Sequence, residues 1–566
     1  MTRTRIPGFH GVVRDDPDAR AVYAEAAGIG RILPRAVAVP TDPDDVATLV
    51  HWAHAAAVPL IPRGSGSSVA GGAIGPGLIV DCSRLRTRGP IDVTTQSVWV
   101  GAGVLCAEVD AAARARGLRF PVDPASAAFC TVGGMAGTNA AGPRTLRYGS
   151  MRRWVRALDC VFADGSRAIV RRGEPPPTHV PAIARLLADG GAPLRQAAAE
   201  RRASRAGVRK DSSGYDIGDY AATRDLVDLL VGSEGTLAVF VGVELALTVA
   251  PAATTSLLAA YGSLEGAVLG ASAARDAGAS ACELFDRTFL ALVRSAADAA
   301  SPSPRPPVSV LDGAEAVLLV ELEGANAADA TAGARRLGEQ LRAVGASNVS
   351  LALDPAAESA LWALRHAANP TLARLDPALK SMQVIEDGCV PPERLPAYVR
   401  GVRAALDRQE LRGAIFGHAG DAHVHVNPLV DVRDPDWRGR LERLLADVTA
   451  LTIALGGTLT GEHGDGRLRT PLLHVICSDD VTAEFARIKA AFDPTGILNP
   501  GVKIPTPGQQ PLEAIKYDPA LPALPESAQR ALTVVARDRA YATHRLDLLE
   551  SGQTPANAGP ELPPTS

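Results

Sequence analysis

The chain has 566 residues, of which 46% are apolar, and a formal net charge of −4 at pH 7. This length is too great for a single hydrophobic core, so two or three domains are expected. The balanced charge lacks the dense basic surface that a phosphate backbone requires, so no nucleic acid is expected as a partner.

The cysteines and the apolar runs bear on the cellular compartment. The seven cysteines never form a Cys-x-x-Cys pair, which argues against a disulfide framework or an iron–sulfur cluster. The N-terminal segment turns polar before an apolar run long enough for a signal peptide, and no later run reaches the ~18 apolar residues of a membrane span. We therefore expect a cytoplasmic protein, with peripheral attachment to a membrane as an open alternative.

The first predicted elements form a strand-rich domain over residues 34–250, which follows an N-terminal segment, residues 1–33. A helix in DVATLVHWAHAAA runs into a strand that stops at Pro62. GLIVDCS, SVWVGAG and ALDCVFADG predict further strands, and CAEVDAAARARG predicts a helix. Residues 170–210 begin polar and proline-bearing, so they are expected to leave the sheet, and a strand that ends at Pro251 closes the domain.

A second domain is predicted over residues 251–455. AVLLVELEG predicts a strand and NAADATAGARRLGEQLRAVG an amphipathic helix, an order typical of an antiparallel sheet covered by helices. PSPRPP, residues 302–307, predicts a surface loop. A helical part, residues 456–505, follows, and then a proline-rich tail, residues 506–566, with one candidate helix from Ala528 to Glu550 and a disordered end.

Three glycine-rich segments indicate a ligand in the first domain. PRGSGSSVAGGAIG, residues 62–75, follows an apolar strand and leaves backbone N–H groups free to converge on an anion. It is neither a Walker loop nor a Rossmann fingerprint, and a plain glycine-rich turn is the alternative. Because residues 121–150 and 231–240 repeat this composition, a long, flat ligand with a pyrophosphate would explain all three segments.

GHAGDAHVHVNPL, residues 417–429, contains three histidines. Strand alternation places His423 and His425 on one face, and a turn could fold His418 back beside His425. Two neutral imidazoles and a carboxylate suit a borderline divalent cation such as Zn²⁺ or Mn²⁺. The carboxylate is expected from Glu462 in TGEHGDG, whose glycines would bring the backbone close to a ligand. Ordinary solvated or hydrogen-bonded strand histidines are the alternative.

The motifs PRGSGSS, DPAS, TVGGMAGTNAAG, LRYG, VGSEGTL, GHAGDAHVH, TGEHGDGR and FDPTGILNPGVK stand together in a characteristic order. This ordered set resembles the flavoprotein family of vanillyl-alcohol oxidase and para-cresol methylhydroxylase over residues 34–505. Within that family it is most similar to the D-2-hydroxy-acid dehydrogenase branch, which includes D-lactate dehydrogenase, the flavoprotein component of glycolate oxidase and D-2-hydroxyglutarate dehydrogenase. The resemblance implies an α+β fold, with a two-subdomain FAD-binding domain of vanillyl-alcohol oxidase type and an α+β cap domain that binds substrate.

The resemblance also implies FAD as cofactor. Non-covalent binding is expected, because Ser67 and Ser68 stand where several relatives carry a histidine that attaches the flavin. Cys130 lies near a second attachment position of some relatives, although a buried small residue is the preferred interpretation. The residues implied to bind FAD are Pro62, Arg63, Gly64, Ser65, Gly66, Ser67, Ser68, Pro121, Thr131, Val132, Gly133, Gly134, Asn139, Gly142, Glu234, Gly235, Thr236 and Asn499.

The same resemblance assigns roles to the histidine cluster. Metal-binding relatives use the matches to His418, His425 and Glu462 as ligands and the match to His463 as the catalytic base. One departure is that Ala422 and His423 replace a Gly-Asn pair of the relatives. Three roles for His423 therefore stay open: it could coordinate the metal, hydrogen-bond the substrate or fill the space of the asparagine.

The substrate carboxylate needs a cation. Arg365, on a helix expected to end at Pro370, and Lys380 match an arginine and a lysine that relatives use for this purpose. Surface charges are the alternative for both.

The implied reaction oxidises a D-2-hydroxy acid of the D-lactate, D-2-hydroxyglutarate or glycolate type to the 2-oxo acid. His463 would take the hydroxyl proton, a hydride would pass to FAD, and the metal would orient the substrate. IEDGCVPPERLP resembles a branch fused to an iron–sulfur domain, but no cysteine follows Cys477. A separate electron acceptor is thus expected, either a quinone, an electron-transfer protein or O₂, to which the tail could dock, and a homodimer stays open.

Three other functions remain as alternatives. A non-oxidative FAD-dependent synthase of the alkyl-dihydroxyacetonephosphate synthase type and a non-catalytic FAD-binding subunit keep the flavin. A metal-dependent hydrolase would use the histidines and the glutamate but would leave the glycine loops without a purpose.

Overall fold

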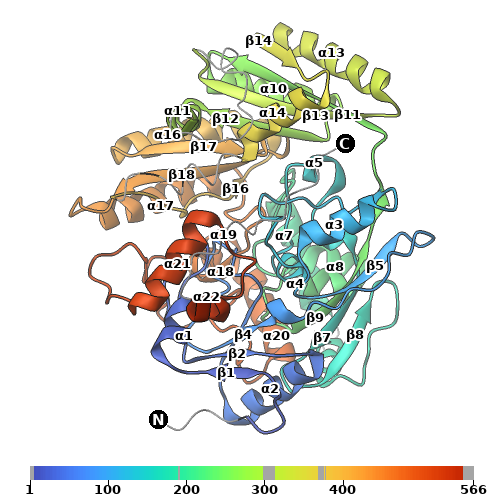
Figure 1. Cartoon of the computed structure of the whole chain (residues 1–566), viewed down its shortest axis with the longest axis vertical. Coiled ribbons are helices and arrows are strands. Elements are labelled where there is room, and N and C mark those ends of the chain that lie inside the picture. The colour runs from blue at the N-terminus through green and yellow to red at the C-terminus, as the bar shows by residue number, and fades with distance from the viewer. Residues whose placement is uncertain are drawn as a thin grey trace.

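The computed structural model describes residues 6–188, 191–297, 313–366, 372, 375 and 378–551. Two four-stranded sheets lie in its N-terminal half (Figure 1). One has the order β1-β2-β4-β3, with β1 antiparallel to three parallel strands, and the other is antiparallel with the order β5-β9-β7-β8. The strands of this half, with the short pair β6 and β10, are β1 (Val12–Arg14), β2 (Ala36–Val39), β3 (Leu60–Arg63), β4 (Leu78–Asp81), β5 (Ser97–Gly101), β6 (Leu118–Arg119), β7 (Val155–Val161), β8 (Arg167–Arg171), β9 (Val239–Ala246) and β10 (Thr248–Val249).

The parallel strands are apolar throughout because both faces of their sheet are covered. Ala36 and Leu78 pack on the face covered by α2 (Pro43–Ala56), whereas Val37 and Ile79 pack on the opposite face. That opposite face is covered by α1 (Pro17–Val22) and by the tail helix α21 (Glu526–Asp538). The tail is therefore part of the fold of the N-terminal half, although it is remote in sequence.

The second half is built on one antiparallel sheet with the order β14-β11-β13-β12-β17-β18-β15, and β16 also pairs with β18. Its strands are β11 (Ala253–Tyr261), β12 (Ala281–Asp286), β13 (Ala316–Gly324), β14 (Ala346–Leu351), β15 (Leu379–Ser381), β16 (Gly388–Cys389), β17 (Arg412–Gly417) and β18 (His423–Asp431). Helices cover both faces, namely α10 (Leu264–Asp276), α13 (Ala327–Ala343), α16 (Leu395–Arg408) and α17 (Trp437–Ala454) on one, and α11 (Arg287–Ala297) and α14 (Pro355–His366) on the other. The α+β class and the antiparallel sheet predicted from the sequence are confirmed.

The remaining helices complete the N-terminal half. They are α3 (Cys106–Arg114), α4 (Val132–Thr138), α5 (Thr145–Tyr148), α6 (Pro181–Ala188), α7 (Ala192–Ser204), α8 (Ile217–Thr223), α9 (Leu226–Leu230), α18 (Gly466–Arg469), α19 (Leu473–Ile476) and α20 (Asp479–Phe492). The last of these packs against α6 and α7, and its Phe485 meets Tyr215 edge-on at 5.7 Å. The chain thus returns from the second sheet to the first half. Strand β8 extends into the segment that was expected to leave the sheet, before α6 and α7 do so.

The tail differs from the prediction of one helix from Ala528 to Glu550. It forms two helices, α21 and α22 (Arg545–Ser551), because Arg539 adopts a left-handed conformation with φ 54° and ends the first. Residues 302–307, 552–566 and Pro370 lie outside the described residues. Among the described residues, none of the helices combines the length and the hydrophobicity that crossing a bilayer requires.

Candidate functional site

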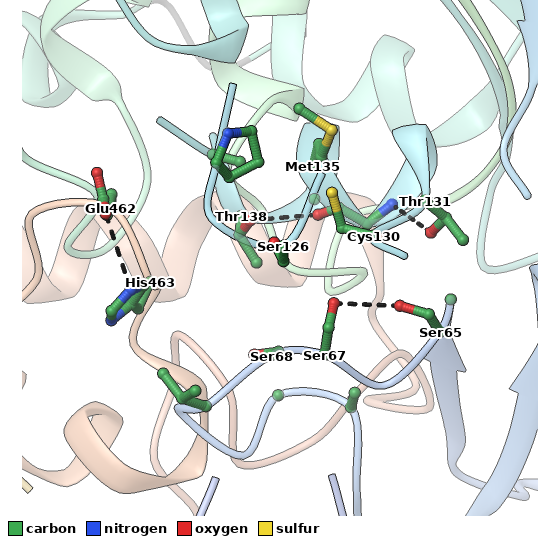
Figure 2. A pocket seen from close by; sticks show the side chains of 18 of the residues that line it. Ser65, Ser67, Ser68, Ser126, Cys130, Thr131, Met135, Thr138, Glu462 and His463 are labelled. Atoms are coloured by element: carbon green, nitrogen blue, oxygen red, sulfur yellow. Dashed lines mark hydrogen bonds and ion pairs between the residues drawn. The ribbon is translucent and has the colours of Figure 1, made fainter. Parts of the chain in front are cut away.

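A cavity of about 260 Å³ is lined by residues from both halves of the chain. Figure 2 shows Ser65, Ser67 and Ser68 on one of its loops and Cys130 and Thr138 across from them, with Glu462 and His463 to the side. The glycine loops and the histidine cluster, which are hundreds of residues apart in sequence, therefore border one space.

The loop after β3 is shaped for a close approach of backbone to ligand. A Cβ on Gly64 would lie 2.1 Å from Oγ1 of Thr131, and Gly66 has φ +71°. Oγ of Ser68 is buried without a hydrogen-bond partner among the described residues. Among the described residues, Arg63, which is 3% exposed, donates only to the backbone carbonyls of Tyr23, Glu25 and Ala73. The hydroxyl of Ser68 and the buried guanidinium of Arg63, which pairs with no carboxylate among the described residues, are groups that fit the pyrophosphate of a dinucleotide.

Most of the residues predicted to bind FAD line this cavity. Those that do are Pro62, Arg63, Gly64, Ser65, Gly66, Ser67, Ser68, Thr131, Gly133, Gly134, Gly142, Glu234 and Gly235. Pro121, Val132, Asn139, Thr236 and Asn499 are buried beside it but do not line it. Asn499 instead donates from Nδ2 to the carbonyls of Gly72 and Glu234, which ties two of the lining loops together.

The histidine cluster is fully buried, which excludes solvated strand histidines. His418, His423, His425 and Glu462 place their ligand atoms within 4.8 Å of one another. Oε1 of Glu462 lies 3.1 Å from Nε2 of His418 and 3.5 Å from Nε2 of His425, while Oε2 lies 3.8 Å from Nδ1 of His423. The hairpin of β17 and β18 brings His418 back beside His425, with ring centroids 5.2 Å apart.

The outward nitrogen of each imidazole is held by another group. Nδ1 of His418 lies 2.6 Å from Glu283, Nε2 of His423 lies 2.9 Å from Asp387, and Nδ1 of His425 lies 2.8 Å from the carbonyl of Glu386. The inward nitrogens are thereby directed at Glu462. This arrangement of partners is typical of metal-ligating histidines, so the donor set fits a divalent cation.

The charge states also suit ligands. Burial lowers the pKa of His425, and it lowers the pKa of His423 to about 4, so both rings are neutral at pH 7. Burial would raise the pKa of Glu462, but His418 and Lys210 hold it well below its usual range. Glu462 and the rings of His423 and His425 thus need lose no proton to bind a cation. Burial would lower the pKa of His418, but Glu283 and Glu462 raise it, so this ring would release a proton when it binds a metal.

His423 is the member of the cluster that does not line the cavity. Its Nδ1 faces Glu462 and has no hydrogen-bond partner among the described residues. Of the three roles expected for it, contact with substrate finds no support in this geometry.

His463 lines the cavity, is 29% exposed, and stacks on His425 with ring centroids 5.0 Å apart. Burial would lower its pKa, but Asp387, together with Glu386 3.3 Å from Nδ1, raises the pKa to about 9. This pKa favours the protonated ring at pH 7, whereas the predicted role as a base needs the neutral ring.

Arg365 and Lys380 differ in position. Arg365, 5% exposed on α14, lines the cavity and donates from Nε to Glu283 at 2.5 Å, so it is not a surface charge. Lys380 lies on β15 outside the lining, with Nζ 5.2 Å from the ring centroid of Tyr517. The geometry keeps Arg365 as a candidate for binding a carboxylate and moves Lys380 away from it.

The glycines of TGEHGDG serve a purpose other than the predicted approach to a ligand. A Cβ on Gly461 would lie 2.6 Å from Nε2 of His423, and one on Gly464 would lie 2.7 Å from the carboxylate of Glu234. These glycines bring the backbone close to protein side chains. The loop packs between the cluster and the glycine loops, and its approach to a ligand stays a prediction.

Four residues of the site were not predicted from the sequence, namely Lys210, Glu283, Glu386 and Asp387. Lys210 is buried with Nζ 2.9 Å from Oε2 of Glu462, and Glu283 joins Arg365 to His418. Glu283 stands inside the apolar strand ACELFD, and an acid buried in a strand was the available signal. Lys210 lies in a segment that was predicted only as an excursion from the sheet, and its charge gave no indication of burial.

Comparison with known proteins places these features in context. Residues 34–170 match the family model "FAD binding domain", and residues 250–502 match "FAD linked oxidases, C-terminal domain". The chain is 30% identical to glycolate oxidase subunit GlcD of Bacillus subtilis, covering 86% of this chain and 93% of that protein. It is 29% identical to D-2-hydroxyglutarate dehydrogenase of Escherichia coli, covering 88% of this chain but 51% of that protein.

Solved structures show the same fold at low sequence identity. The 4-ethylphenol oxidase of Gulosibacter chungangensis has a TM-score of 0.64 at 15% identity, covering 88% of this chain and 94% of that chain. An alkyldihydroxyacetonephosphate synthase has a TM-score of 0.59 at 14% identity, covering 88% and 83%. The predicted fold of vanillyl-alcohol oxidase type is confirmed.

Proposed function

The chain belongs to the FAD-linked oxidase family, and from that premise we propose that it oxidises a small D-2-hydroxy acid to the 2-oxo acid. The observation that carries the proposal is the single cavity shared by the glycine loops, His463 and the imidazole–carboxylate cluster. Relatives named for glycolate and for D-2-hydroxyglutarate support this substrate class. D-Lactate, D-2-hydroxyglutarate and glycolate are the candidates.

Binding and orientation of substrate fall to the second half of the chain. Arg365 offers a buried guanidinium to the substrate carboxylate while Glu283 fixes its position. Lys380 stays a weaker candidate because it lies outside the cavity lining. Two walls of the cavity, the glycine loops and the cluster, would hold the substrate between them and exclude water.

Proton transfer falls to His463. Nδ1 lies near Glu386 and Asp387, which leaves Nε2 to take the hydroxyl proton. FAD, when bound, supplies the acceptor for the hydride. His418, His425 and Glu462 would hold Zn²⁺ or Mn²⁺, whose positive charge would lower the pKa of a substrate hydroxyl and of His463.

Other partners follow from the sequence. FAD is proposed to bind without a covalent bond, since Ser67 and Ser68 offer no imidazole, although Cys130 lines the cavity. Acid precipitation that releases FAD into the supernatant would support this.

Electrons are proposed to leave to a quinone, an electron-transfer protein or O₂. The hydrolase alternative lacks a role for the glycine loops.

The proposal is tested by mixing the purified protein anaerobically with matched D- and L-2-hydroxy acids and following flavin absorbance. We expect bleaching by one or more D-acids or by glycolate and none by the L-enantiomers. Prior treatment with a chelator should slow bleaching, and Zn²⁺ or Mn²⁺ should restore it. No bleaching by any 2-hydroxy acid would overturn the substrate class, whereas bleaching that is insensitive to the chelator would overturn the metal alone.

A further inference from the structure

The C-terminal tail lies beyond the part of the chain that the family model matches, and it contacts two loops that line the FAD cavity. The match to the FAD-linked oxidase model ends at residue 502, whereas the described chain continues to residue 551. Its helices α21 and α22 lie beside α1, at the sheet whose strand β3 leads into the glycine loop (Figure 1). The connection between these helices is the part that contacts the loops.

Two loops of the cavity are bridged by this connection. Arg539 donates from Nη2 to the carbonyl of Ala125 at 3.2 Å and lies over the ring of Phe129, 4.7 Å from its centroid. The ring of Tyr541 lies 5.2 Å from that of Phe129. Arg545 donates from Nη2 to the carbonyl of Ser65 at 3.3 Å, in the glycine loop. The connection, together with the first residue of α22, therefore joins the loop at residues 64–68 to the loop at residues 124–130.

Arg545 is a buried cation without an anionic partner. It is 3% exposed, its other hydrogen bonds are long contacts to the carbonyls of Ala540 and Thr543, and its Nε has no partner in the described part of the chain. Asp81, the nearby acid, bonds instead to Tyr23 and lies 3.3 Å from His544. Burial and repulsion from Arg63 lower the pKa of Arg545 to about 10.

Arg63 and Arg545 thus place two buried guanidinium groups beside one glycine loop. Neither forms an ion pair with a carboxylate among the described residues, and the nearby groups that offset their charge are the rings of Tyr23 and Tyr541 and the carboxylate of Asp81. Burial of unpaired charge is costly, and such a cost is recovered when an anion binds nearby. The loop at residues 64–68 lines the cavity. Arg545, which does not line the cavity, would complement an anion held there through the loop, whereas Arg63 lines the cavity itself.

We propose that the C-terminal tail is a strap that sets the affinity for FAD, and that Arg545 is a positioning residue that holds the glycine loop and supplies positive charge behind the pyrophosphate. This rests on FAD binding, which family membership gives, and not on the identity of the substrate. Failure of the hydroxy-acid assay would therefore leave it standing.

The test uses the full-length protein with point variants, because deleting the tail would expose a face of the parallel sheet. Arg545→Gln, Arg545→Lys and a control on the exposed side of α21, Arg530→Gln, are freed of FAD. The dissociation constant for FAD is then measured at low and high salt, and the unfolding temperature is measured without FAD.

We expect Arg545→Gln to weaken FAD binding about tenfold or more at low salt, with a smaller difference at high salt. Its FAD-free form should unfold no earlier than the wild type, since an unpaired buried charge is removed. Arg545→Lys should recover most of the affinity, and Arg530→Gln should match the wild type. An FAD affinity of Arg545→Gln within twofold of the wild type would overturn the proposal. A loss of affinity that accompanies early unfolding and is not recovered by lysine would also overturn it.

Discussion

Replacing Glu283 by glutamine is expected to weaken both the fold and the site. Glu283 is 0% exposed, and its two oxygens lie 2.6 Å from Nδ1 of His418 and 2.5 Å from Nε of Arg365. Glutamine keeps the volume but removes the charge. The buried guanidinium of Arg365 then loses its carboxylate, and breaking a buried ion pair in this way costs about 3–5 kcal/mol.

The pKa of Glu283 gives an independent magnitude. Burial would raise this pKa, but His418 and Arg365 outweigh it and lower the pKa to about 2 from the ordinary 4.5. That difference corresponds to about 3 kcal/mol in favour of the folded state. Because the folded pKa is the lower one, the contribution is complete above the ordinary pKa and is lost as pH falls towards 2. It should be about 2 kcal/mol at pH 3.5.

The assay is urea unfolding of wild type and Glu283→Gln at pH 7.5, 5.0 and 3.5, combined with kcat/KM for the best hydroxy acid. We expect the variant to lose the same free energy of unfolding at pH 7.5 and 5.0, and less at pH 3.5. Since His418 loses the partner that orients it, kcat/KM should fall about 10- to 100-fold. A free energy of unfolding within 1 kcal/mol of the wild type at pH 7.5, or a loss that does not shrink at pH 3.5, would refute this reasoning.

Glu321→Gln provides a matched control. Glu321 is equally buried on the neighbouring strand β13 and pairs with Arg144 and Ser280, but it does not line the cavity. Its replacement should also destabilise the fold, while kcat/KM of the folded protein stays unchanged. The comparison separates loss of stability from loss of orientation at the site.

The remaining predictions concern the base, the glycine loop and a buried acid. His463→Gln should lower the rate of flavin reduction about 10²–10⁴-fold with unchanged FAD content, as measured by anaerobic stopped flow. Gly64→Ala, whose Cβ would lie 2.1 Å from Oγ1 of Thr131, should purify with less than half the FAD of wild type, judged from the flavin-to-protein absorbance ratio. Burial raises the pKa of Asp286 to about 6 from 3.8, so its ionisation favours unfolding as pH rises through 6. Asp286→Asn should therefore gain up to about 3 kcal/mol in urea unfolding at pH 8 and little at pH 4.

Local chemistry explains what the sequence could predict. A glycine-rich loop directly after an apolar strand has few uses other than a close approach of backbone to an anion, and the structure places PRGSGSS at the cavity. The alternation in AHVHVN put His423 and His425 on one face of a strand, and β18 has that geometry. Both features depend on neighbouring residues alone, so they need no knowledge of the tertiary fold.

What escaped the sequence depends on packing between distant segments. Lys210 reaches Glu462 across 252 positions, and Glu283 reaches His418 across 135. Lys380 matched a motif, but it lies on β15 against the ring of Tyr517. The tail was predicted to carry one helix, but its composition gave no indication that alanine, valine and leucine side chains from α21 and α22 bury one face of the parallel sheet.

The loop TGEHGDG links the histidine cluster to the glycine-rich turn of the FAD-binding half. Glu462 and His463 face the cluster and the cavity, while the backbone N–H groups of Asp465 and Gly466 donate to the carboxylate of Glu234 at 2.7 and 3.0 Å. Lys503, fully buried, lies 3.0 Å from Glu234 and 2.9 Å from Asp465 and offsets their charges. Because Glu234 belongs to a glycine-rich turn of the cofactor half, this buried triad fixes the distance between that turn and the cluster. A rigid spacing of this kind is what hydride transfer requires, since the donor carbon must be held against its acceptor within a few tenths of an ångström.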